Sequence, residues 1–288
     1  MPDIHKTDII ALIFDFDDTL APDTTTWFLE KHGINTDKFW KRDVDALVKD
    51  GYDNPPAFLR LLLAGVADLT NRELREFGAS IGKDPYHFYD GVTDFFGDVR
   101  QIVTDNYRDI SVEFYIISGG LYELVSSTPI AGEFKGIYGC HLGGDTSDGP
   151  LKYIKRTVTF TEKTRYIFEI NKGIAPSDSL RNPKLVNELQ PEETRRIPLK
   201  NMIYTGDGLT DIPCFTLIKK NGGTVFGVFD PTSKKKTQEA FEKFMKAGRV
   251  HNVFEPDYRP EKALGSMLRM AVGKICTQIE LDRNQPPR

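Results

Sequence analysis

Three acidic residues crowd the end of an apolar run in the segment IFDFDDTL, residues 13–20. Asp15, Asp17 and Asp18 are followed directly by Thr19. Burying carboxylates beside a hydrophobic strand is costly unless each one is paired or holds a metal ion. Side chains two residues apart in a strand point to the same side, so Asp15 and Asp17 can face one cleft. For Asp18 we expect only local hydrogen bonds.

Two more apolar runs end in polar, glycine-rich segments. Residues 112–117 precede Ser118 in SGG, and residues 202–204 precede Asp207 in TGDG. In doubly wound sheets, ligands bind outside the carboxyl ends of the strands. We therefore expect Asp15, Ser118 and Asp207 to converge on one crevice. A DxD pair alone is usually a turn, but three polar strand ends in order are much rarer by chance.

The apolar runs predict the elements that position these side chains. Buried strands are expected at 9–14, 112–117, 202–204, 224–229 and 250–254, because each run is short and rich in β-branched or aromatic residues. Helical patterns separate them, and one helix should begin after Ser233. Repeated strand–helix units predict an α/β fold with a doubly wound parallel sheet.

A long segment between the first two strands has a different character. Residues 21–90 read as short amphipathic helices and exceed what a strand crossover needs, so we predict a small all-helical cap domain. Residues 1–20 and 91–288 would then form the core domain. A hairpin is expected within 137–160, around the turn GGDTSDGP. Residues 174–200 read as an excursion whose purpose the sequence leaves open.

The composition narrows the class of protein. The chain has 288 residues, 39% hydrophobic and 28% charged, with a formal net charge of -4, which argues against a dedicated nucleic-acid binder. Cys140, Cys214 and Cys276 form no CxxC pair, a pattern that fits a reducing compartment. We see no signal-peptide or membrane-spanning pattern, and expect a soluble cytoplasmic protein without a membrane partner.

Four motifs together resemble the haloacid dehalogenase-like superfamily, in particular its phosphoserine-phosphatase-like hydrolases with a helical cap. DFDDT is similar to the nucleophile loop DxDxT, and IISGG to the serine loop of the second strand. TFTEKTRYIFEINKG resembles the lysine segment, and GDGLTD the last acidic motif. The resemblance covers residues 1–20 and most of 91–255. The helical insert matches the family's cap in position and helical character.

The resemblance implies a Mg²⁺-dependent phosphatase that works through an aspartyl-phosphate. Asp15 would attack phosphorus, and Asp17 would protonate the leaving alcohol and later deprotonate water. Mg²⁺ would be held by a side-chain oxygen of Asp15, the backbone carbonyl of Asp17 and the carboxylate of Asp207. Thr19 would help to hold the loop. Asp211 would act through water or by orienting the lysine, although a helix N-cap would also explain it.

The phosphate group needs hydrogen-bond donors. By the same resemblance these are the hydroxyl of Ser118, the backbone N–H of Gly119 and the ammonium of Lys163, which would also hold the nucleophile. Lys163 lies in the first turn of a predicted helix. Lys152 and Lys172 are the alternatives for the active-site lysine.

The insert should act as a lid over a small phosphate ester, because closure excludes water and brings recognition groups to the leaving group. Candidates for substrate contact are Trp27, Phe28, Phe39, Trp40, Tyr52, Phe58 and Arg60, although aromatics at helical spacing more often form a core. Two other functions stay open, namely phosphoryl transfer to an organic acceptor and a non-catalytic binding protein of the same fold. The substrate and the oligomeric state do not follow from the sequence.

Overall fold

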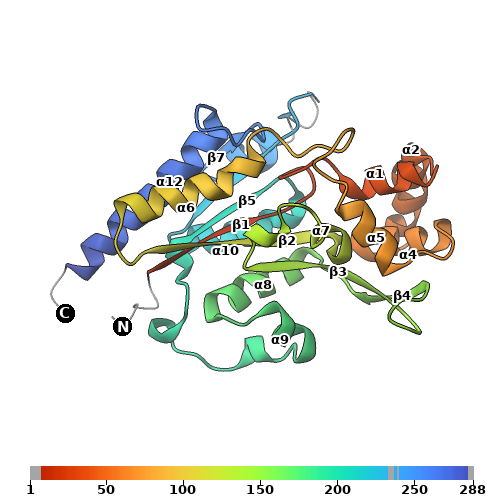
Figure 1. Cartoon of the computed structure of the whole chain (residues 1–288), viewed down its shortest axis with the longest axis horizontal. Helices are drawn as coiled ribbons and strands as arrows, with labels where there is room; N and C mark the ends of the chain where they lie inside the picture. Colours follow the sequence, from red (N-terminus) through yellow and green to blue (C-terminus); the bar gives the residue numbers. More distant parts are fainter. Residues whose placement is uncertain (1–7, 233–236, 239, 285–288) are drawn as a thin grey trace.

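A seven-stranded sheet forms the centre of the protein in a computed structural model, which describes residues 8–232, 237–238 and 240–284 (Figure 1). The strand order is β4-β3-β2-β1-β5-β6-β7, parallel except for the antiparallel pair β3–β4. The strands are β1 Ile9–Phe14, β2 Ser111–Leu121, β3 Gly136–Gly144, β4 Leu151–Arg156, β5 Met202–Gly206, β6 Thr224–Val228 and β7 Asn252–Phe254. The predicted α/β class, doubly wound sheet and hairpin are confirmed.

The central strand β1 is buried along its whole length, as its unbroken apolar sequence requires. Its register pairs Ile13 with Tyr115 of β2 on one side and with Tyr204 of β5 on the other. The carboxyl ends of β1, β2 and β5 therefore lie side by side. This adjacency brings together polar residues that are far apart in the sequence.

Helices cover both faces of the sheet (Figure 1). The helices α6 and α12 pack together on β1, β2 and β5, and α8 and α10 pack on the opposite face. The helices outside the insert are α6 Val92–Asn106, α7 Tyr122–Val125, α8 Phe160–Lys172, α9 Pro176–Arg181, α10 Ile212–Lys220 and α12 Ala263–Arg283. Short 3-10 turns are η2 Ala131–Glu133, η3 Leu185–Asn187, η4 Glu192–Thr194, η5 Leu199–Asn201 and η6 Leu209–Asp211. The sequence analysis did not predict α12.

The segment after β1 is helical and lies at one end of the molecule, beside the β3–β4 hairpin (Figure 1). Its elements are α1 Thr24–Lys31, α2 Thr36–Lys38, the π-helix η1 Phe39–Val44, α3 Asp45–Lys49, α4 Asn54–Gly65 and α5 Asn71–Gly78. The backbone N–H of Leu151 at the start of β4 donates to the carbonyl of Leu69, at 2.7 Å. The hairpin and the insert therefore contact each other through the backbone.

One expected strand end is wrong. The strand β2 does not stop before Ser118 but continues to Leu121, and its pairing with β3 shifts register between Ile117 and Leu121. The pairing of β2 with β1 ends at Ile116. Glycines 119 and 120 allow this irregularity, and the strand continues because β3 extends beyond β1 at this edge.

The expected helix start at Ser233 lies outside the described residues. The described part of that segment includes the π-helix η7 Phe241–Lys246, which precedes β7. Within the described chain, every helix falls short of the length or apolarity needed to cross a bilayer.

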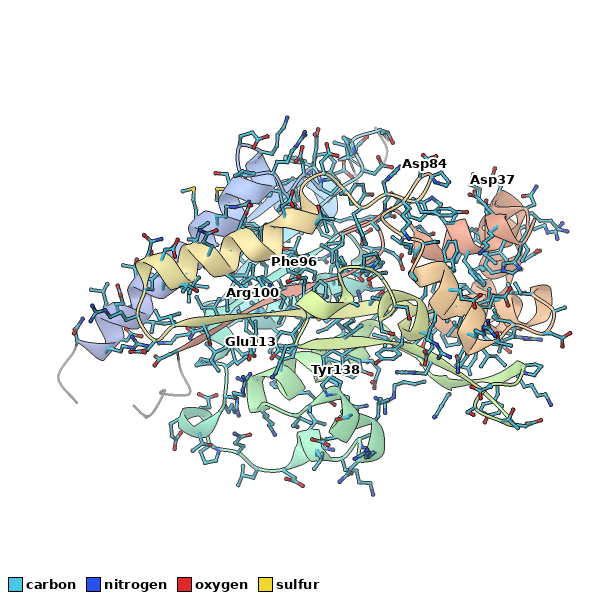
Figure 2. The ribbon with its side chains drawn as sticks, in the orientation of Figure 1. Asp37, Asp84, Phe96, Arg100, Glu113 and Tyr138 are labelled. Atoms are coloured by element: carbon cyan, nitrogen blue, oxygen red, sulfur yellow. The ribbon has the colours of Figure 1, made fainter. Side chains whose placement is uncertain are left out.

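An aromatic cluster joins β1 to the helices that cover it. The ring of Phe14 lies 6.1 Å from the rings of both Phe95 and Phe96 on α6, with interplanar angles of 88°. Phe96, which is labelled in Figure 2, also meets Phe114 of β2, with 5.0 Å between the ring centroids. Edge-to-face packing of this kind adds to the burial of large apolar area. Arg100 covers the Phe114 ring from the next turn of α6, with 4.9 Å between its guanidinium carbon and the ring centroid.

We expect the substitution Phe96→Ala to lower the free energy of unfolding by about 3–5 kcal/mol, because it leaves a cavity beneath β1. Chemical denaturation followed by circular dichroism measures this loss. The matched control is Phe241→Ala, since the Phe241 side chain is 56% exposed and should cost far less. Equal losses in the two variants would contradict the proposed core.

Candidate active site

The site begins where β1 ends. The backbone N–H of Asp15 still donates to the Thr205 carbonyl of β5, at 2.9 Å, and the Asp15 side chain is 6% exposed. Its Oδ1 accepts from the N–H of Phe16 at 2.7 Å. The chain then turns through Asp18, whose positive φ of 54° is tolerated by aspartate better than by most residues. This turn leaves Phe16 in the core and directs the neighbouring acids to the end of the sheet.

A buried ammonium joins two acids of the site. Lys163 Nζ donates to Asp15 Oδ2 at 2.5 Å and to Asp211 Oδ1 at 2.7 Å. All three side chains are almost completely buried. Burial disfavours the charged form of Lys163, but the charges of Asp15 and Asp211 overcome it and raise the lysine's pKa. The lysine therefore stays charged.

The two alternative lysines lie elsewhere. Lys152 on β4 is exposed and pairs with Asp145 in the hairpin. Lys172 donates to the carbonyls of Val186 and Glu188, at 2.6 Å each. Of the three lysines considered, the structure places Lys163 against Asp15.

Asp211 is fully occupied by protein donors. Besides Lys163, its Oδ1 accepts from the Tyr204 hydroxyl at 2.7 Å, and its Oδ2 accepts from the N–H of Gly208 at 3.0 Å. It does not cap α10 with its side chain. A Cβ at Gly206 would lie 2.5 Å from Asp211 Oδ2, so only glycine leaves room for this carboxylate. Asp211 is thus held in place beside the ammonium of Lys163.

Asp17 and Ser118 meet across the tips of β1 and β2. Asp17 Oδ1 accepts from the N–H and the hydroxyl of Thr24, at 2.8 and 2.6 Å. The hydroxyl of Ser118 accepts from the N–H of Gly120 at 2.9 Å. A Cβ at Gly120 would lie 2.6 Å from Asp17 Oδ2 and 3.1 Å from Ser118 Oγ, so glycine is required for this approach.

Asp15, Ser118 and Asp207, which were predicted to converge, line one cavity of about 190 Å³. Its lining combines residues of the core with residues of the insert. They are Asp15, Asp17, Asp18, Asp23, Thr25, Trp40, Asn54, Pro55, Phe58, Ser118, Gly119, Gly120, Val158, Asp207 and Thr210. The strand ends predicted to meet therefore do meet in space.

Thr19 lies behind this cavity rather than in it. Its side chain is completely buried, and its hydroxyl has no hydrogen-bond partner among the described residues. Its carbonyl accepts from the Tyr258 hydroxyl at 2.9 Å. Thr19 thus joins the loop after β1 to Tyr258 through its backbone carbonyl.

The carboxylates of the site raise one another's pKa values. Burial, only partly offset by Lys163, raises the pKa of Asp15 to about 6. Burial and the charge of Asp23 raise the pKa of Asp17 to about 8. Burial and the charge of Asp15 also hold the pKa of Asp207 well above its ordinary value. The single ammonium of Lys163 therefore does not neutralise all of these carboxylates.

The site's donor set fits a divalent cation. Carboxylate oxygens of Asp15, Asp207 and Asp211 lie within 4.8 Å of one another. Asp211 is committed to its three donors, whereas Asp207 accepts no hydrogen bond from the described residues. Hard oxygen ligands with excess negative charge suit Mg²⁺. Asp15 and Asp207 are therefore the side chains available to such an ion.

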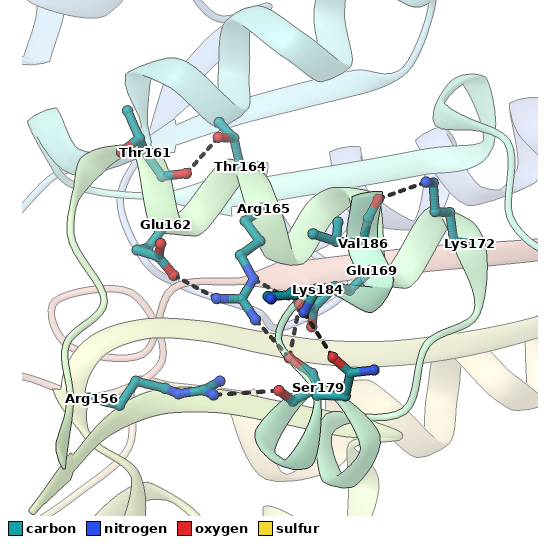
Figure 3. A network of polar contacts seen from close by, with 11 residues as sticks. Arg156, Thr161, Glu162, Thr164, Arg165, Glu169, Lys172, Ser179, Lys184 and Val186 are labelled. Carbon is teal, nitrogen blue, oxygen red and sulfur yellow. Dashed lines mark hydrogen bonds and ion pairs between the residues drawn. The ribbon is translucent and has the colours of Figure 1, made fainter. Parts of the chain in front are cut away.

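The helix that carries Lys163 is anchored by the excursion after it (Figure 3). Arg165 donates to Glu169 at 2.9 Å and to the hydroxyl of Ser179 at 3.1 Å, and this hydroxyl donates to Glu169 at 2.8 Å. Arg156 of β4 reaches the carbonyl of Ser179 at 3.4 Å. These contacts tie α8 to α9 and give residues 174–200 a structural role that the sequence did not reveal.

Two of the aromatic candidates in the insert line the cavity. Trp40 and Phe58 face it, with ring centroids 5.6 Å apart. Phe28 and Phe39 are buried within the insert instead.

The other candidates make contacts away from the cavity. Trp27 packs on Tyr86, with ring centroids 5.2 Å apart. Arg60 donates to the Tyr52 hydroxyl at 2.6 Å, at the surface of the insert.

Sequence reasoning missed several residues around the acids. Asp23 and Thr24 lie at the start of α1, where Asp23 accepts from the N–H of Thr26 as a helix N-cap. An aspartate before three threonines is typical of such a cap, and this pattern could have predicted that the first helix of the insert begins beside the site. Nothing local indicated Asn54 or Tyr204.

Comparisons with known proteins agree with this architecture. No protein-family model matches the chain. An uncharacterized protein of Borreliella burgdorferi is 29% identical over 309 residues, covering 96% of this chain and 99% of that protein. Among solved structures, a phosphoserine phosphatase with a phospho-aspartyl intermediate analogue gives a TM-score of 0.52 at 14% identity, covering 92% of this chain and 99% of that one.

Two more solved structures are similar. A probable phosphoserine phosphatase from Vibrio cholerae gives a TM-score of 0.56 at 11% identity, covering 95% of this chain and 67% of that one. A HAD-family hydrolase from Salmonella enterica serovar Typhi gives 0.55 at 13% identity, covering 87% and 68%. The chain therefore has the haloacid dehalogenase-like fold, in the form found in phosphoserine phosphatases.

Proposed function

We propose that this protein is a Mg²⁺-dependent phosphatase that hydrolyses a small phosphate ester through an aspartyl-phosphate at Asp15. One observation carries the proposal. The Asp15 carboxylate shares a cavity with Asp17, Ser118 and Asp207, while Lys163 ties it to Asp211. This proximity supports a site in which Asp15 is the nucleophile, Asp17 the proton donor, Ser118 a hydrogen-bond donor to phosphate and Lys163 the cation.

Asp15 would attack phosphorus and Asp17 would serve the leaving group. Since burial raises the pKa of Asp17 to about 8, this carboxyl holds a proton at neutral pH. That proton passes to the leaving alcohol oxygen as the P–O bond of the ester breaks. Asp17 then accepts a proton from the water that attacks the aspartyl-phosphate, which releases phosphate and restores Asp15.

The remaining groups would bind the phosphoryl oxygens. Ser118 and the N–H of Gly119 are the proposed hydrogen-bond donors, and Lys163 supplies positive charge beside the nucleophile. Asp15, the backbone carbonyl of Asp17 and Asp207 would hold Mg²⁺. When bound, this ion offsets the repulsion between the nucleophile and the phosphate.

We further propose that residues 21–90 act as a cap domain on a core of residues 1–20 and 91–288. The support is that Trp40, Asn54 and Phe58 of the insert line the cavity that holds Asp15. A cytoplasmic location fits the buried free thiols of the three cysteines.

The direct test is turnover of a generic aryl phosphate with and without Mg²⁺. We expect the substitution Asp15→Asn to lower kcat by at least about 10³-fold, because the amide cannot form the aspartyl-phosphate. The control Asp37→Asn makes the same change at an exposed site of the insert. Full turnover by the Asp15→Asn variant would refute the proposal, and product formed only with an added alcohol would identify a phosphotransferase.

The lysine assignment has its own test. We expect Lys163→Met to lower kcat by about 10²-fold or more and to lower the melting temperature, since it leaves Asp15 and Asp211 buried without their cation. Lys152→Met removes an exposed lysine and should change neither. A Lys163→Met variant that stays folded and fully active would show that the ammonium has no part in the reaction.

The effect of pH on the melting temperature tests Mg²⁺ binding without any turnover. Because Asp15 and Asp17 hold protons more tightly in the folded chain than in the unfolded one, the stability that these two carboxyls contribute to the metal-free fold is lost as pH rises from about 4 to 8. Mg²⁺ binds the ionised carboxylates, so millimolar Mg²⁺ should raise the melting temperature more at about pH 8 than at about pH 6. Asp207→Asn should remove most of this shift. A shift independent of pH and of Asp207 would argue against the assigned ligands.

A further inference from the structure

The leaving group of the proposed reaction must lie on the side of Asp17. Asp17 lines the cavity beneath the insert, but it does not line the neighbouring cavity of about 200 Å³, which contains Asp207, Asp230 and Lys243. An alcohol oxygen that takes its proton from Asp17 therefore projects its substituent toward the insert. The insert residues that line this cavity are Asp23, Thr25, Trp40, Asn54, Pro55 and Phe58.

This side of the cavity is strongly acidic. Its lining includes five aspartates, Asp15, Asp17, Asp18, Asp23 and Asp207, and the side chain of Asp23 is half-buried. The lining of this cavity, all of it within the described chain, contains no lysine, arginine or histidine. Lys163 is 1% exposed and committed to Asp15 and Asp211. A carboxylate on the leaving group would therefore find no cationic side chain in this lining, and Asp23 would repel it.

Two aromatic side chains line the same cavity. The rings of Trp40 and Phe58 lie 5.6 Å apart at an angle of 58°. Trp40 Nε1 donates to the Thr26 hydroxyl at 2.7 Å, and this hydroxyl donates to Asp23 Oδ2 at 2.5 Å. The chain of hydrogen bonds fixes the Trp40 ring relative to the Asp23 carboxylate. Aromatic faces attract ammonium groups, and tryptophan does so most strongly.

We propose, building on the phosphatase function above, that the leaving group is a positively charged alcohol, namely an amino alcohol or a quaternary ammonium alcohol. Trp40 and Phe58 would contact the cation and Asp23 would balance its charge. These three side chains then determine specificity, and none of them takes part in phosphoryl transfer.

The helix-capping role of Asp23 does not account for this arrangement by itself. Each Asp23 oxygen accepts from one Thr26 group, and a carboxylate oxygen can accept a second interaction. A cap also works with asparagine, which has no charge. The substitution Asp23→Asn therefore separates the charge of the residue from its capping function.

Four esters that differ in the charge of the alcohol test the proposal. They are ethyl phosphate, O-phosphoethanolamine, phosphocholine and O-phosphoserine. We expect kcat/KM for the better of the two carboxylate-free cationic esters to exceed that for ethyl phosphate by about 10-fold or more. It should exceed that for O-phosphoserine by at least the same factor. Equal values across the series, or a preference for O-phosphoserine, would overturn the inference while leaving the phosphatase function intact.

Variants locate the preference in the structure. Asp23→Asn and Trp40→Leu should each lower the ratio of kcat/KM for the preferred cationic ester to that for ethyl phosphate by about 10-fold. Asp23→Asn also removes a charge that raises the pKa of Asp17, so it should change the turnover of both esters, and their ratio at one pH isolates recognition of the cation. The control Asp37→Asn, an exposed acid of the same insert, should leave the ratio unchanged. An unchanged ratio in both pocket variants would contradict the assignment.

Binding gives a readout that does not depend on turnover. In the Asp15→Asn variant with Mg²⁺, calorimetry should show tighter binding of the cationic ester than of ethyl phosphate, and Asp23→Asn in the same background should remove the difference. Absence of turnover of any ester would refute the phosphatase function alone. Equal binding of cationic and neutral esters would refute the charge preference alone.

Discussion

The buried ammonium of Lys163 between Asp15 and Asp211 is the interaction on which the site depends. An ammonium without solvent is tolerated only where opposite charges and hydrogen bonds replace water, and here two carboxylates do so at 2.5 and 2.7 Å. These three residues belong to three segments that are far apart in the sequence, namely the end of β1, α8 and η6. Their pairing requires β1, α8 and η6 to take one relative position, and that position aims Asp15 into the cavity.

The order of strands in the sheet makes this arrangement possible. β1 is apolar along its length and lies between β2 and β5, so the three strand ends are neighbours by topology. The apolar core beneath, with Phe14, Phe95 and Phe96, supplies the stability that offsets the burial of charge at the ends of the strands. Acids that repel one another therefore remain together in the folded chain.

The convergence of Asp15, Ser118 and Asp207 could be predicted because each stands at or near the end of an apolar run, and such patterns are local. The choice of Lys163 over Lys152 and Lys172 came from the family resemblance and not from the local pattern, because the position of this lysine depends on how α8 packs. Arg165, Glu169 and Ser179 fix that packing through a distant segment. The predicted end of β2 was wrong for a similar reason, since the pairing of β2 with β3 joins segments that are apart in the sequence. No sequence pattern predicted the hydrogen bond from Tyr204 to Asp211.

The insert is coupled to the chemistry through Asp17 itself. The proposed proton donor accepts two hydrogen bonds from Thr24, the first residue of α1, and the preceding Asp23 is linked through Thr26 to Trp40. A displacement of α1 would therefore change the hydrogen bonds that favour the ionised form of Asp17 and move the Trp40 ring at the same time. Because one short segment holds both the acid and the walls of the leaving-group side, recognition of the alcohol and its protonation depend on the same contacts.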